Sequence, residues 1–203
     1  VKSKETYSEE KAEALFARFV TNNTWQVPTL VVARFVAQID SNPNQYVPAL
    51  RSSQRPKNNR SLIEVTSDKL ESVSTTAQNA FDLVYAMNRA GVKFMAGTDV
   101  PNPFVVPGRS LHDELELLVQ AGFTPLEALQ CATRNPAEYL GKLYTLGTVE
   151  KGKIADLVLL DANPLENIGN SRKIWAVIVK GKILLRPQLD KMLSRDAANE
   201  SSP

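Results

Sequence analysis

The sequence is poor in the residues that most often build metal sites and disulfides. Among its 203 residues there is one histidine, His112, and one cysteine, Cys131. The single cysteine excludes a disulfide within the chain, and its apolar helical surroundings favour a buried small side chain over a nucleophile. The single histidine leaves the chain short of the ligands that a metal-activated hydrolase requires.

Strong net charge and long apolar runs are also missing. The 24 basic and 22 acidic residues leave a net charge of +2, which gives no electrostatic argument for binding nucleic acid. No apolar run reaches the roughly 18 residues that indicate a transmembrane helix, so we expect no membrane span. We expect no signal peptide within these residues, and the first residue is valine, not methionine. We therefore expect an excised or truncated piece, and the sequence does not choose between cytoplasm and export.

What remains is the composition of an ordinary soluble globular protein, with 43% hydrophobic and 23% charged residues. In the first half, helical spacing follows a possible capping box formed by Thr6 and Glu9. Residues 40–59 are rich in Asn, Ser and Pro, and we expect weak order there. The other expected elements are a helix over 8–21, a strand over 25–32, a helix over 77–88 and a strand over 92–96.

The second half begins with helices and changes to strands at Gly147. Thr124, Pro125 and Glu127 form a strong helix start, and Asn135 begins a further short helix. We expect helices over 110–121, from 125 onward and after 135, a first hairpin over 148–160, a second over 174–185, a last helical turn over 189–193, and a frayed tail over 197–203.

The apolar strand Val92–Ala96 is followed at once by Gly97, Thr98 and Asp99. A carboxylate at the carboxyl end of a buried strand is where barrel enzymes place catalytic groups. Caps and turns also use aspartate freely, so a helix cap or a loop salt bridge is the alternative interpretation of Asp99.

Several longer motifs accompany this aspartate. In order along the chain they are Ala-Gly-Thr-Asp at 96–99, Pro-Gly-Arg-Ser-Leu-His-Asp-Glu-Leu at 107–115, Ala-Gly-Phe-Thr-Pro-Leu-Glu-Ala-Leu at 121–129, Ala-Thr-Arg-Asn-Pro-Ala at 132–137, and Gly-Thr-Val-Glu-Lys-Gly-Lys-Ile-Ala-Asp-Leu-Val at 147–158. Together they resemble the C-terminal part of the metal-dependent amidohydrolase superfamily, with imidazolonepropionase-like and prolidase-like members the most similar. The resemblance spans about residues 25–185.

The resemblance implies an α/β fold, namely the C-terminal fragment of a (β/α)8 TIM-type barrel with part of a small β-sandwich. Strands seven and eight and their helices would come from this chain. The implied domains are residues 1–142 as barrel, 143–189 as the C-terminal share of the sandwich, and 190–203 as a short helix with a flexible tail.

By the same resemblance, Asp99 matches the strand-eight aspartate that binds a divalent metal such as zinc and handles the proton of the attacking water. The family's other metal ligands belong upstream of Val1. A lone carboxylate does not complete a zinc site, so we expect no tightly bound metal and no activity in the isolated chain.

The loop after Asp99 offers residues that could shape a substrate pocket, namely Asn102, Phe104 and Arg109. His112 is either a substrate contact or, more simply, a helix residue hydrogen-bonded to loop backbone. We expect the C-terminal portion of a hydrolase of C–N bonds in amides, cyclic amides or dipeptides, with the missing barrel half or a second copy as partner. The alternative is a non-catalytic interaction module with an amidohydrolase-derived fold.

Overall fold

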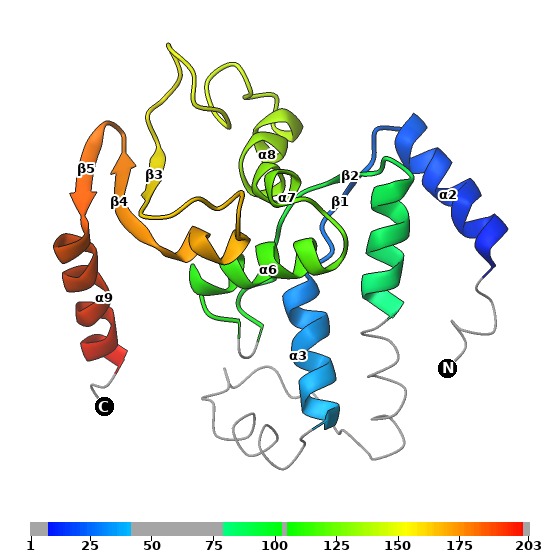
Figure 1. Ribbon diagram of the computed structural model, residues 1–203, viewed down its shortest axis with the longest axis horizontal. Helices are drawn as coiled ribbons and strands as arrows, with labels where there is room; N and C mark the ends of the chain where they lie inside the picture. Colours follow the sequence, from blue (N-terminus) through cyan, green and yellow to red (C-terminus); the bar gives the residue numbers. More distant parts are fainter. Residues whose placement is uncertain (1–7, 42–78, 103–104, 201–203) are drawn as a thin grey trace. The chain divides into compact units, whose positions relative to one another are not determined.

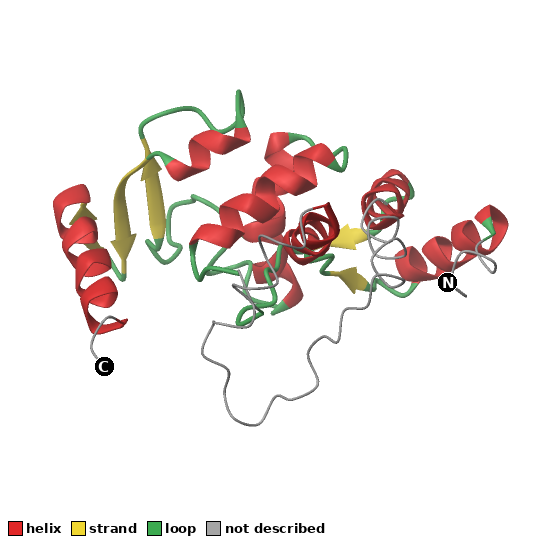
Figure 2. Ribbon diagram, turned by 90° about the horizontal axis from the view of Figure 1, so that it is seen from below, coloured by secondary structure: helices red, strands yellow, loops and turns green. Residues whose placement is uncertain are grey.

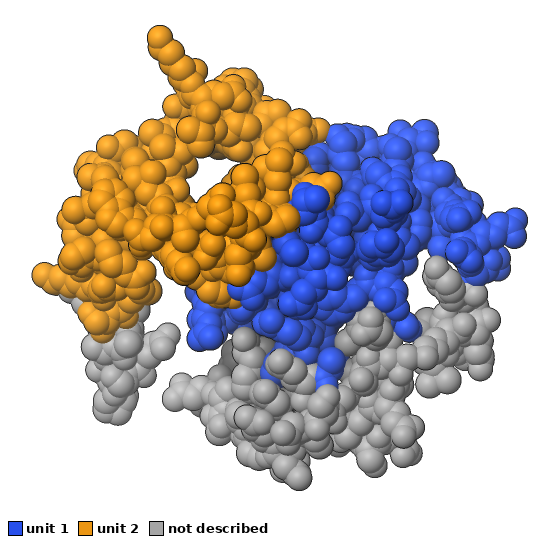
Figure 3. Space-filling model, viewed as in Figure 1, with its two compact units in different colours: residues 1–124 blue, residues 125–203 orange. Residues whose placement is uncertain are grey.

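The computed structural model describes residues 8–41, 79–102 and 105–200. The chain divides into two compact units, Val1–Thr124 and Pro125–Pro203, which are coloured separately in Figure 3. We describe each unit by itself. The predicted domain limits at residues 142 and 189 separate a barrel portion, a sandwich portion and a terminal segment. They are not tested by this division and stay a prediction.

Unit 1 begins with the helix α2 (Glu9–Thr21). Ser8 is its N-cap, since the Ser8 side chain accepts a hydrogen bond from the backbone N–H of Lys11. Glu9 and Glu10 in the first turn complement the helix dipole. The helix has the predicted extent, but the cap is Ser8 and not the predicted Thr6, which lies outside the described residues.

A pair of short parallel strands forms the sheet of unit 1. β1 (Trp25–Gln26) pairs with β2 (Lys93–Phe94), Trp25 opposite Lys93 and Gln26 opposite Phe94. Figure 1 shows the two strands side by side. Parallel neighbours need a crossover connection, which here includes the helix α3 (Leu30–Ser41) and a helical segment over 79–89. The unit is therefore an α/β arrangement of the βαβ kind.

Apolar side chains from strands and helices form the core of this unit. The ring of Phe94 meets that of Phe123 edge to face, with centroids 5.2 Å apart, and Leu118 of α6 (Arg109–Gln120) is fully buried. Edge-to-face contact is a preferred aromatic geometry. The buried apolar residues of unit 1 are Phe16, Leu30, Val31, Val84, Met87, Val92, Phe94, Val105, Leu115, Leu117, Leu118, Ala121 and Phe123.

Unit 2 opens with two consecutive helices, α7 (Pro125–Ala132) and α8 (Arg134–Tyr139). After α8 the chain comes back to this helix at Gly147, whose φ is +87°. A methyl group on Gly147 would lie 2.6 Å from the Cβ of Ala137 and 3.1 Å from the Cα of Arg134. Backbone and helix are therefore in direct contact at this glycine.

The rest of unit 2 is an antiparallel sheet in the order β3 (Leu157–Leu160), β4 (Ile174–Val179), β5 (Lys182–Leu185). The 3₁₀ helix η1 (Ile168–Arg172) joins β3 to β4. The helix α9 (Arg186–Glu200) follows β5 and contacts β4 and β5, as Figure 2 shows. The predicted second hairpin is confirmed.

Three predicted elements differ from the structure. The strand expected over 25–32 ends at Gln26, because a helix starts at Leu30. Thr148 and Val149 form no strand, so the first hairpin is wrong apart from β3. The last helix is longer than the turn expected over 189–193, and it includes residues 197–200 of the expected tail. Residues 42–59 of the expected weakly ordered segment lie outside the described residues, whereas 40 and 41 belong to α3.

Candidate active site

The carboxyl ends of β1 and β2 meet at one edge of the parallel pair, and each strand is followed there by a turn. Val27, Pro28 and Thr29 follow β1, and Thr29 has a φ of +48°. A methyl group on Gly97, in the turn after β2, would overlap Cγ1 of Val27. Glycine at position 97 therefore allows the two turns to pack directly against each other.

Asp99 ends the turn after β2 and is exposed. Its φ of +55° lies in the left-handed region, which aspartate and asparagine tolerate better than most residues. The side-chain amide of Asn102 donates to Asp99 Oδ2 at 2.5 Å and to the Asp99 carbonyl at 3.0 Å. Among the predicted site residues, the structure thus brings Asp99 and Asn102 together.

The loop that carries this pair is anchored at its far end. The N–H of Val105 donates to the Asn102 carbonyl, and the Val105 side chain is buried. The buried hydroxyl of Ser110 accepts from the N–H of Val106 at 2.8 Å. These contacts fix the loop against the start of α6.

Of the remaining predicted site residues, the structure describes the positions of Arg109 and His112. Arg109 is exposed as the first residue of α6, and His112 is half-buried one turn later. Phe104 lies outside the described residues. The substrate-binding roles predicted for Asn102, Phe104, Arg109 and His112 stay predictions.

Glu114 is a residue that the sequence reasoning did not single out. Its side chain is 0% exposed, and its Oε1 and Oε2 accept from the N–H groups of Leu30 at 3.0 Å and Val31 at 2.8 Å. These amides begin α3, where N–H groups have no partner within the helix. Its spacing in the sequence could have indicated its burial, because Glu114 lies on the same buried face of α6 as Leu117 and Leu118. A charged residue on a buried face needs a specific partner.

Burial raises the pKa of Glu114 from its ordinary value of 4.5 to about 7, although the N–H groups of Val31 and Leu30 and the charge of Arg34 oppose the rise. Between pH 4.5 and about pH 7, Glu114 is therefore protonated in the folded chain and ionised in the unfolded chain. Raising the pH through this window therefore favours unfolding.

We expect the free energy of unfolding of the wild type to fall by about 3 kcal/mol more than that of Glu114→Gln as the pH rises from 4.5 to 7.5. Urea unfolding of both proteins at several pH values measures this difference, and the variant serves as the control for all other titrating groups. Parallel stability curves for the two proteins would contradict the raised pKa.

The described residues do not by themselves form a metal site. In ranges 8–41, 79–102 and 105–200, no three His, Cys, Asp or Glu side chains gather closely enough to hold an ion. Asp99 contributes one carboxylate at the edge of the parallel pair, and structural or catalytic zinc takes at least three protein ligands. The described part of the chain therefore does not fit a metal without further ligands.

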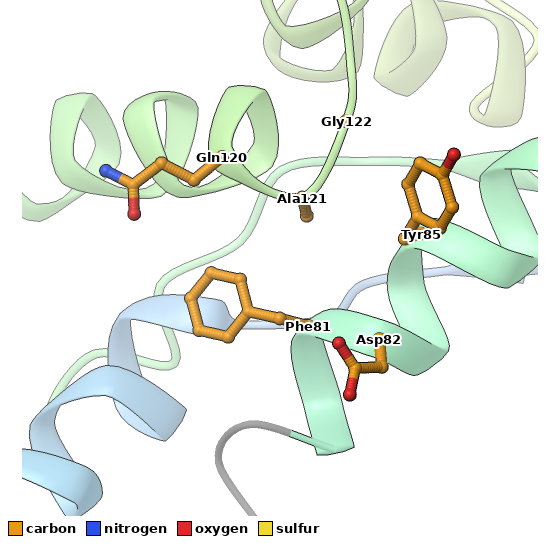
Figure 4. Close-up of a pocket in the computed structure, with 6 residues that line it drawn as sticks. All are labelled: Phe81, Asp82, Tyr85, Gln120, Ala121 and Gly122. Atoms are coloured by element: carbon orange, nitrogen blue, oxygen red, sulfur yellow. The ribbon is translucent and has the colours of Figure 1, made fainter.

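A surface hollow of about 460 Å³ lies elsewhere in unit 1 (Figure 4), lined by Phe81, Asp82, Tyr85, Gln120, Ala121 and Gly122. The Tyr85 ring packs over Gly122, where a methyl group would lie 2.5 Å from Cδ2 of that ring. Its lining residues come from the helical segment over 79–89 and from the end of α6 with the two residues that follow it. None of the lining residues belongs to the Asp99 turn.

The sequence itself decides the family. The model of the Amidohydrolase family matches residues 41–184, a stretch that includes Asp99, Asn102 and Glu114. The chain belongs to the amidohydrolase family. This amidohydrolase has no described helix with both the length and the apolar character required to cross a membrane.

Individual relatives agree with this membership. The amidohydrolase chain is 33% identical to an ochratoxinase of Aspergillus niger over 113 residues, 55% of this chain and 22% of the relative. It is 34% identical to an imidazolonepropionase of Shouchella clausii (strain KSM-K16) over 110 residues, 49% of this chain and 24% of the relative. These matches therefore cover less than a quarter of either relative.

A solved structure gives the same result for the fold. A Xaa-Pro dipeptidase with methionine bound in its active site superposes with a TM-score of 0.65 at 26% identity, over 84% of this chain and 36% of that one. The resemblance to imidazolonepropionase-like and prolidase-like proteins is confirmed, and the α/β fold is that of amidohydrolases.

Proposed function

We propose that the chain is the C-terminal portion of a metal-dependent hydrolase that cleaves C–N bonds in amides, cyclic amides or dipeptides. The observation that carries this is the position of Asp99, directly after a parallel strand and inside the matched family region. The names of the relatives support a C–N substrate class, because they include an imidazolonepropionase and a Xaa-Pro dipeptidase.

In this function Asp99 accepts the proton of the attacking water and returns it to the leaving nitrogen. Its exposure at the carboxyl edge of the strands leaves the carboxylate accessible. Asn102 holds one carboxylate oxygen and the Asp99 carbonyl, so Asn102 orients the acid. Asn102, Arg109, Phe104 and His112 are proposed to line the substrate pocket.

The same proposal assigns the metal to the assembled hydrolase, where Asp99 is one ligand among several. Residues 1–142 then form the last portion of a (β/α)8 barrel, with β1 and β2 as its seventh and eighth strands. Residues 143–189 are assigned to part of a β-sandwich and 190–203 to a terminal helix and tail, although the helix α9 already begins at Arg186. The match covers 36% of the Xaa-Pro dipeptidase, and in this proposal the rest of the barrel comes from the missing half or from a second copy of the chain.

A second candidate is a non-catalytic module that associates through its sheet. Val158, Trp175 and Val179 share one face of the β3–β4–β5 sheet by register, and their side chains are 55%, 48% and 44% exposed. Adjacent exposed apolar side chains favour association with another surface. In this second candidate, the partner that packs against this face of the sheet is a second copy of the chain.

Co-expression tests the hydrolase. The chain is produced alone and together with the polypeptide encoded ahead of Val1, and bound zinc and hydrolysis of a Xaa-Pro dipeptide, an amide and a cyclic amide are measured. We expect neither zinc nor activity with the chain alone and both with the assembled protein. Assembly that yields no bound metal and no hydrolysis would contradict the hydrolase, and a stable dimer of the chain alone would then favour the second candidate.

A further inference from the structure

The backbone turn after β1 contains a residue in a costly conformation. Thr29 lies in the left-handed region at +48°, a conformation that costs a threonine about 1 kcal/mol or more. Leu30 and Val31 follow, and their N–H groups begin α3. A turn of this kind persists only when contacts elsewhere determine it.

Glu114 provides those contacts from another helix. Both of its carboxylate oxygens accept backbone N–H groups of α3, across 84 and 83 residues of sequence. A second tie between the same helices joins Arg34 to Asp113 at 3.6 Å. Only the Glu114 tie is made to the first two amides of the helix, immediately after Thr29.

The turn held in this way contacts the turn that carries Asp99. Cγ1 of Val27 occupies the space where a side chain on Gly97 would begin, and Cγ2 of Thr29 lies 3.8 Å from the same point. Gly97 is two residues before Asp99. A displacement of the first turn is therefore transmitted to the second by direct contact.

We propose that Glu114 is a positioning residue of the Asp99 site. It fixes the Val27–Thr29 turn through the first two amides of α3, and that turn fixes the Gly97–Asp99 turn through the contact of Val27 with Gly97. This inference rests on the proposed function, because only that function makes the Asp99 turn an active site. The contacts that couple the two turns all lie within this chain, so the coupling can be measured without a partner or a substrate.

A purely structural cap would not need a buried acid. A short side chain preceding the helix satisfies the same amides without placing a carboxylate in the core. Arg34 on α3 is the charged group that acts on Glu114, and it favours the ionised form. Since Asp113 on α6 pairs with Arg34, protonation of Glu114 changes the charge at a site already connected to both helices.

Amide NMR of the full chain tests the coupling without any assay of hydrolysis. The backbone amide shifts of Leu30, Val31 and Gly97 are followed from pH 5 to 8.5 in the wild type, in Glu114→Gln and in Asp113→Asn. We expect all three amides of the wild type to titrate with one common midpoint near pH 7, since one group controls them. In Glu114→Gln this titration is lost, while Asp113→Asn retains it.

Hydrogen exchange gives a second readout. A glutamine side chain has one carbonyl oxygen in place of two acceptors, so the exchange rate of at least one of the amides of Leu30 and Val31 rises about tenfold or more in Glu114→Gln. Asp113→Asn, which removes the other tie between α3 and α6, changes these rates by less than about threefold.

Two results would overturn the proposal: a Gly97 amide that does not follow the titration of Leu30 and Val31, or equal effects of Asp113→Asn and Glu114→Gln. Should Glu114→Gln fail to fold, the wild-type titration still decides. A negative NMR result would contradict the coupling but not the proposed hydrolase function. An inactive assembled protein would contradict the hydrolase function but not the coupling.

Discussion

Replacing Asp99 by asparagine is expected to lower kcat/KM of the assembled hydrolase about 10³-fold, the middle of the range for loss of a general base. Asparagine is the informative substitution because it also tolerates the left-handed conformation at +55°. The turn is then retained, while the proton acceptor and the charged metal ligand of the proposal are both lost. Steady-state hydrolysis of a Xaa-Pro dipeptide measures the effect.

The matched control is Asp156→Asn. The Asp156 carboxylate accepts the N–H of Lys180 at 2.6 Å within unit 2, and the proposed function gives it no role in hydrolysis. Its kcat/KM should stay within about threefold of the wild type, which is an effect below 1 kcal/mol. If Asp99→Asn were as active as Asp156→Asn, Asp99 would not be the proton acceptor.

Replacing Gly147 by alanine is expected to destabilise unit 2 by about 2–4 kcal/mol. Two physical effects add at this position. The φ of +87° strains any L side chain, and the new methyl would meet Ala137, Arg134 and Thr133, two of them through backbone atoms. Urea unfolding followed by the fluorescence of Trp175, in a Trp25→Phe background, reports on this unit.

Gly152→Ala separates the two effects. Gly152 has a similar φ of +94°, but a methyl group there meets nothing within 4 Å. We expect it to cost about 1 kcal/mol, the conformational part alone. Equal destabilisation by the two variants would mean that the contact of Gly147 with α8 contributes nothing.

The elements that the sequence predicted well are those whose signals are local. The helix over 9–21 has apolar residues at helical spacing and a polar cap beside it. β2 follows Gly91, which ends the preceding helix, and its apolar run stops on Asp99. Each of these signals lies within a few residues of the structure that it determines, so periodicity and turn chemistry suffice.

The start of α3 could not be predicted in the same way. Trp25, Val27, Val31 and Val32 are β-favouring residues, and on local preference they extend the strand. The helix instead begins at Leu30 because Glu114, distant in sequence, satisfies its first amides. A tertiary contact here overrides the local preference.

The candidate site was predictable only in part for a related reason. A carboxylate at the end of an apolar run indicates Asp99, whereas Asn102 is indicated only by its position in the following loop. The structure joins these two by hydrogen bonds. The sequence does not indicate the role of Glu114, because a charged residue within a helix is usually solvated, and only the structure shows that it is buried and bound to the first amides of α3.

The span of 84 residues between Leu30 and Glu114 also has a consequence for the order of folding. A ribosome adding about 5–20 residues per second needs about 4–17 s to reach Glu114 after releasing the codon for Leu30. During that interval Glu114 is not available to the first amides of α3. The register of Trp25 with Lys93 closes a loop of 68 residues, since 93 − 25 = 68. The parallel pair and the start of α3 therefore both depend on segments distant in sequence, and loop-closure entropy slows the formation of both.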